Sequence, residues 1–95
     1  MSLMRLQVLR EEQIQLLLDL GVLDPRADEG TAYRIWGALL ADPIFRIMRW
    51  TIRDPKRPSV VPYSATFTAV ASMSRAEKDA LAERIIAACQ PHKTA

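Results

Sequence analysis

Three Asp-Pro pairs constrain the fold of this chain more than any other feature. They are Asp24-Pro25, Asp42-Pro43 and Asp54-Pro55. Proline disfavours helical geometry in the residue before it but fits the first turn of a helix, and an aspartate at the cap can accept hydrogen bonds from unpaired backbone amides. Each pair can therefore end one element and begin another.

The middle pair divides the densest apolar stretch, Ile35 to Arg53, into two expected helices. The first of these runs from about Thr31 to Leu40. At about 100° per residue, one face of this helix would carry Ala32, Ile35, Trp36, Leu39 and Leu40. This face is expected to lie in the core.

The second of these helices is predicted over Pro43 to Arg53, with Asp42 as its cap. A broad apolar arc is expected on its buried side, made of Ile44, Phe45, Ile47, Met48, Thr51 and Ile52. Arginines at i, i+3 and i+7 would line the far side, namely Arg46, Arg49 and Arg53. Trp50 falls at the border between the two sides.

Two further helices have local start and stop signals. Glu11 to Leu20 begins with two acids, which the positive end of the helix dipole favours, and Gly21 fits the position just after its end. Ser74 and Glu77 have the spacing of a capping box at the start of the last helix, which Pro91 ends. Its predicted buried stripe is Leu81, Ile85, Ala88 and Cys89.

Two segments allow a strand. Leu3 to Leu9 alternates over a short distance, and Tyr63 to Met73 alternates between apolar and small or hydroxyl side chains. Threonine and aromatic residues favour strand in the second segment, although its alanines leave a helix open. The expectation is a minor two-stranded element that pairs the two segments.

The length and composition fit one domain. Ninety-five residues, of which 49% are hydrophobic, can form one compact core. The predicted fold class is mainly α, a small single-domain bundle of about four helices over residues 4–91. Met1 to Leu3 are interpreted as an expression leader and His92 to Ala95 as a disordered tail.

The sequence predicts no catalytic, cofactor or metal site. The one histidine, His92, lies in the expected tail, and Cys89 and His92 have only half the ligands of a structural zinc site. The three glycines match no nucleotide-binding motif. No signal peptide or membrane span is evident, so we expect a cytoplasmic protein that is not an enzyme and does not contact a membrane.

Charge is unevenly distributed, although the formal net charge is only +2. Six of the eleven acids precede Gly30, whereas five basic residues lie between positions 46 and 57. The candidate interaction face is the basic cluster with its tryptophan: Arg46, Arg49, Trp50, Arg53, Lys56 and Arg57.

Two functional hypotheses follow. The first is a small non-enzymatic protein–protein interaction module, an adaptor, regulator or assembly subunit, that self-associates as a homodimer. The alternative is a nucleic-acid-binding protein of helix-turn-helix type that uses the Arg46, Arg49 and Arg53 side.

Overall fold

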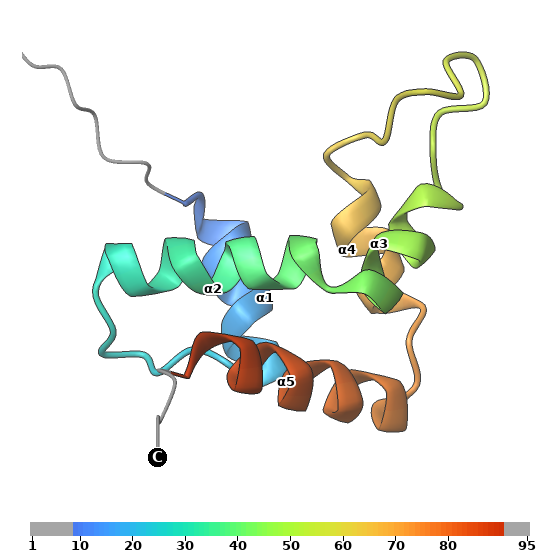
Figure 1. The fold of residues 1–95 in the computed structure, drawn as a ribbon. Coiled ribbons are helices and arrows are strands. Elements are labelled where there is room, and N and C mark those ends of the chain that lie inside the picture. The colour runs from blue at the N-terminus through green and yellow to red at the C-terminus, as the bar shows by residue number, and fades with distance from the viewer. Residues whose placement is uncertain (1–8, 91–95) are drawn as a thin grey trace, which may run out of the picture.

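The computed structural model describes residues 9–90 of the chain. This part of the chain contains five helices and no strand. In order, they are α1 (Glu11–Leu20), α2 (Glu29–Ala41), α3 (Pro43–Trp50), α4 (Ala65–Ala71) and α5 (Arg75–Cys89) (Figure 1). The mainly helical class is confirmed, with one helix more than expected.

The three Asp-Pro pairs behave differently from one another. Asp42 begins α3, and its Oδ2 accepts a hydrogen bond from the backbone amide of Phe45 at 3.0 Å. Asp24 and Asp54 instead accept from backbone amides two residues further on, each at 2.9 Å, which is the geometry of an Asx turn. The cap of α2 is Asp28, which does not precede a proline.

The signals at the end of α1 and at the start of α5 are confirmed, whereas Pro91, the expected stop of α5, lies outside the described residues. Gly21 follows α1 with a φ of 78°, a left-handed conformation that glycine adopts without strain. Ser74 and Glu77 form the capping box at the start of α5: the Glu77 amide donates to Ser74 Oγ, and the Ser74 amide donates to Glu77 Oε1.

The prediction of a strand at Tyr63 to Met73 is wrong. Residues 65–71 form α4, which buries Ala65, Ala69 and Val70 on one side at helical spacing. Three of the seven residues of α4 are alanines, which have the highest helix propensity. The proposed partner strand, Leu3 to Leu9, lies outside the described residues except for Leu9, which is buried against the helical core.

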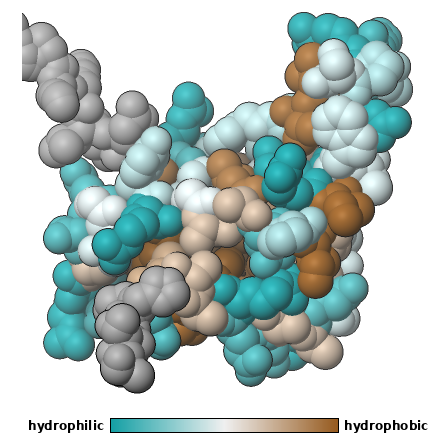
Figure 2. Space-filling view, in the orientation of Figure 1, coloured by the Kyte–Doolittle hydropathy of each residue, from teal (hydrophilic) through white to brown (hydrophobic). Residues whose placement is uncertain are grey.

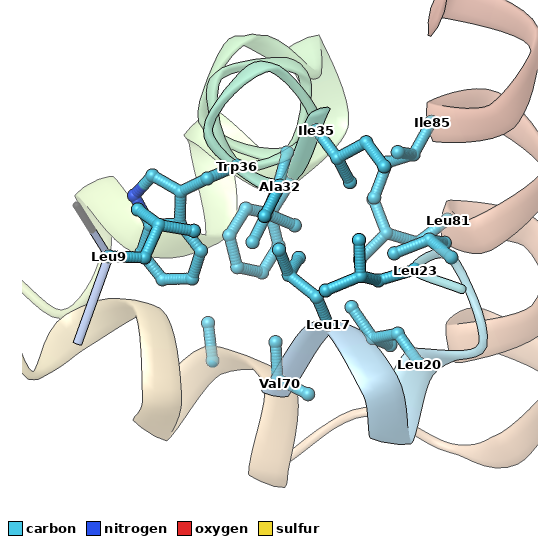
Figure 3. Packing of buried hydrophobic residues seen from close by; sticks show 14 of the residues in the cluster. Leu9, Leu17, Leu20, Leu23, Ala32, Ile35, Trp36, Val70, Leu81 and Ile85 are labelled. Carbon is cyan, nitrogen blue, oxygen red and sulfur yellow. The ribbon is translucent and has the colours of Figure 1, made fainter. Parts of the chain in front are cut away.

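The core forms around α2, which packs against α1, α3 and α5. Figure 3 shows Ala32, Ile35 and Trp36 of α2 pointing toward side chains from the neighbouring helices. The largest fully buried side chains come from four helices: Leu17, Leu39, Phe45, Leu81 and Ile85. Because α2 packs against three other helices, both of its ends have fixed positions. The α1–α2 link lies at one end and α3 at the other.

The long connection between α3 and α4 returns to the body of the protein at Tyr63. The Tyr63 hydroxyl donates to Glu12 Oε2 at 3.1 Å, and its ring packs edge-on against Phe67 with 5.3 Å between centroids. Within residues 9–90, no helix has the length and apolar character needed to cross a membrane.

Candidate docking face on α3

The outward side of α3 carries an apolar ridge made of Ile44, Ile47 and Trp50. These side chains follow one another at i, i+3 and i+6, which brings them to adjacent positions on one side of a helix. Their exposed fractions are 53%, 67% and 48%. Figure 2 shows hydrophobic surface at the side of the molecule where Figure 1 places α3. Within residues 9–90, no side chain covers the ridge.

The expectation that the whole apolar arc of this helix is buried is therefore wrong. The covered side runs instead along Phe45, Met48 and Arg49, at i, i+3 and i+4, and is continued by Ile52 in the turn after α3, which ends at Trp50 and not at Arg53. Phe45 is fully buried and the other three are half-buried, because α3 turns this side toward α2 and α4. This orientation leaves the rest of the arc in solvent.

Two exposed arginines flank the ridge. Arg46 lies beside Ile47 and Trp50, and with Pro43 these residues line a shallow hollow of about 300 Å³. The Arg53 guanidinium lies over the Trp50 ring, 5.1 Å from its centroid, and its Nη1 donates to the Trp50 carbonyl at 3.1 Å. A cation over an indole face is attracted by the π electrons of the ring. Trp50 is thus half exposed to solvent, with Arg53 against one face of its ring.

Arg49 does not belong to the exposed face. Its side chain is half-buried, and its Nε is buried without a hydrogen-bond partner among residues 9–90. Burial, followed by the nearby positive charge of Arg46, lowers the pKa of the Arg49 guanidinium. The predicted stripe of three aligned arginines is therefore interrupted in the middle.

The last two basic residues of the predicted face, Lys56 and Arg57, are exposed in the connection after α3. Arg57 Nε lies 3.5 Å from Asp54 Oδ2, so a neighbouring carboxylate offsets part of its charge. The face predicted from the sequence includes Arg46, Trp50 and Arg53, which are exposed, but not Ile44 and Ile47. Their spacing with Trp50 is the signal that could have found them.

The described residues show no arrangement suited to a metal ion: nowhere in 9–90 do three or more His, Cys, Asp or Glu side chains come together. Cys89 is half-buried near the end of α5, and the other member of the possible half-site, His92, lies outside the described range. Neither a protein-family model nor a curated protein nor a solved structure matches this chain.

Proposed function

We propose that this protein is a small non-enzymatic protein–protein interaction module that docks its partner on the apolar ridge of α3. The observation that carries the proposal is the uncovered row of Ile44, Ile47 and Trp50 between two exposed arginines. Tryptophan and arginine are enriched where binding energy is concentrated in protein interfaces. Apolar side chains at helical spacing are also the usual anchors of a helix in a partner's groove.

Other exposed apolar side chains in the described part of the chain support a docking site less well. Tyr33 lies on α2, Ile86 on α5, and Val60 and Tyr63 in the α3–α4 connection. Single exposed apolar residues of this kind are normal on protein surfaces. The ridge differs because three large side chains adjoin one another on one element.

Burial of the ridge can contribute a substantial part of a binding free energy. Burial of a large apolar side chain contributes roughly 1.5–3 kcal/mol, and about half of each ridge side chain is still available for burial. The three residues together can thus contribute on the order of 3 kcal/mol. A stable complex needs further contacts around them, which Arg46 and Arg53 are placed to make.

Position-specific photo-crosslinking tests the proposal. A photoreactive amino acid replaces Ile47 in one variant and Ile86 in another; both residues are exposed isoleucines, on α3 and α5 respectively. The purified protein is irradiated alone and after addition to an extract of its source cells. Adducts with a protein, either a second copy or another chain, are expected from position 47 and not from 86. Equal labelling from both positions, or none from 47, would contradict the proposal.

Nucleic acid is the second candidate partner. Arg46, Trp50 and Arg53 adjoin one another in solvent, and an exposed indole beside guanidinium groups can stack on a base and contact phosphates. The helix-turn-helix form of this idea has less support, because Asp42 alone joins α2 to α3, whereas that motif has a turn of about three or four residues. Titration with single-stranded and duplex DNA at low salt tests this alternative. It predicts that the wild-type protein binds and that the Arg46→Glu variant binds more weakly; no binding by the wild type would contradict it.

A further inference from the structure

We infer that the ridge of one copy docks into an acid-rimmed groove on a second copy, so that the chains associate head to tail. The inference rests on the proposed function, since it names the partner of the same ridge. Three features of the molecule support this contact: a groove of matching chemistry, the separation of ridge and groove within one chain, and the like charges that a symmetric contact would bring together.

The groove lies between α1, the α1–α2 link and the start of α2, and has a volume of about 190 Å³. Its lining is mostly apolar: Ile14 and Leu18 from α1, Leu23 and Ala27 from the link, and Ala32 from α2. Ile14 and Leu18 are half-buried. The groove thus offers apolar surface on which the ridge isoleucines and Trp50 can pack.

Three acids, Asp24, Asp28 and Glu29, form the rim of this groove. All three are exposed. Arg26 lies 3.6 Å from Asp24 and offsets part of its charge. The hydrogen bonds from Thr31, and less strongly the positive charge of Arg34, lower the pKa of Asp28 and keep this carboxylate ionised. Three acids thus face two basic residues around the groove. The rim is therefore acidic, whereas the ridge is flanked by Arg46 and Arg53. Opposite charges around two apolar centres are the complementarity that gives an interface its specificity.

The groove and the ridge lie at opposite ends of α2. Glu29 begins this helix, and α3 begins immediately after Asp42 at its other end. Thirteen residues of α helix span about 20 Å, and Figure 1 shows the α1–α2 link and α3 on opposite sides of the molecule. One chain cannot bring its own ridge to its own groove, so the contact joins two copies.

A two-fold dimer through the ridge is disfavoured by charge. Such a dimer would gather Arg46 and Arg53 of both copies at one interface, and like charges at an interface weaken association. The head-to-tail contact pairs these arginines with acids instead. An open row of copies has one unfilled ridge at one end and one unfilled groove at the other. The assembly can therefore add further copies as the concentration rises, or close into a ring.

The test is a mixing experiment with two variants, each of which lacks one half of the contact. Ile47→Glu disables the ridge, and the double variant Ala27→Arg, Glu29→Lys blocks the groove and reverses a rim charge. Sedimentation velocity measures the mass of each protein at several concentrations and two salt concentrations. Circular dichroism verifies the fold of each variant, and Glu29→Lys alone replaces the double variant if the latter does not fold.

The wild-type protein is expected to form oligomers whose mass rises with concentration and falls with salt. Each variant alone is expected to be monomeric. Their equimolar mixture is expected to form a 1:1 dimer and nothing larger, because only one intact ridge and one intact groove can meet. Monomeric wild-type protein at every concentration overturns the inference, even if position 47 crosslinks to a different protein and the interaction role stands. Wild-type dimers that the groove variants do not affect also overturn it, in favour of a symmetric contact.

Discussion

Arg84 of α5 holds the carboxylate of Asp42 by two hydrogen bonds, from Nε to Oδ1 at 2.8 Å and from Nη2 to Oδ2 at 2.9 Å. The same carboxylate accepts the amide of Phe45 and so begins α3. Asp42 is buried at the junction of α2 and α3, and Arg84 lies 42 positions away from it in the sequence. This pair links α5 to the start of the helix that carries the ridge.

Loss of this ion pair is expected to cost far more stability than loss of a surface pair. Arg84→Ala leaves a buried carboxylate with only its capping bonds, so we predict a loss of about 2–3 kcal/mol in the free energy of unfolding. Arg75→Ala is the control, because Arg75 pairs with Asp79 at 3.3 Å on the exposed side of the same helix. The control should lose less than about 1 kcal/mol. Urea unfolding measures both losses. Equal losses would contradict the expectation that the Asp42–Arg84 pair stabilises the fold more than a surface pair does.

Stability should fall in acid partly through Asp42. The hydrogen bonds from Arg84 lower the pKa of the Asp42 carboxyl, against the opposing effect of burial and with help from the Phe45 amide. Since the folded-state pKa lies below the ordinary value of 3.8, this contribution is fully present above that pH and is lost as pH falls toward the folded-state pKa.

The measurement is the free energy of unfolding of wild type and Asp42→Asn between pH 7 and pH 2.5. Asparagine still caps a helix but does not titrate, so the variant should lose less stability than wild type below about pH 4. If the two proteins lost stability in parallel as the pH fell, a lowered pKa of Asp42 would be contradicted.

Phe45 and Ile47 should respond oppositely to truncation, although both are large apolar residues on α3. Phe45 is fully buried, so Phe45→Ala should cost roughly 3–5 kcal/mol through lost burial and a residual cavity. Ile47 is exposed, so Ile47→Ala should change stability by about 0.5 kcal/mol or less. Chemical denaturation of the two variants in dilute protein, where copies do not associate, measures this difference. A large loss from Ile47→Ala would place that side chain in the core.

The two tryptophans should differ in access to solvent. Trp36 is buried beside Phe67, whereas Trp50 is exposed under the Arg53 guanidinium. In dilute protein, iodide should quench Trp50 more strongly than a neutral quencher does, because Arg46 and Arg53 attract the anion. Trp50→Phe should remove most of the iodide-sensitive emission. Strong iodide quenching that remained in this variant would contradict the assignment of Trp36 to the core.

The parts of the fold that the sequence predicts depend on neighbours in the chain. A left-handed glycine after α1 and the reciprocal bonds of Ser74 and Glu77 each involve groups within a few residues, so spacing alone identifies them. The helix at 65–71 was missed because its alternating pattern fits a strand equally well. Packing of its alanines against the core, a long-range effect, decides between the two.

The candidate face was only partly predictable, because tertiary contacts decide which side of α3 is covered. The apolar arc of α3 is about as wide as half the helix, and its sequence does not determine which part of the arc turns inward. Contacts with α2 and α4 place Phe45 and Arg49 on the covered side and leave Ile44 and Ile47 outside. The acid-rimmed groove was missed because it joins residues from two helices and a link, whose proximity depends on the tertiary fold.

Methyl NMR of an isoleucine-labelled sample tests the head-to-tail account most directly. The isoleucines report on the ridge at Ile44 and Ile47, on the groove at Ile14, on the core at Ile35, and on an unrelated exposed helix surface at Ile86. As concentration rises, the ridge and groove signals are predicted to shift together while Ile86 stays constant. Ridge signals that do not change with concentration, or that shift while Ile14 stays constant, would contradict a ridge-to-groove contact between copies.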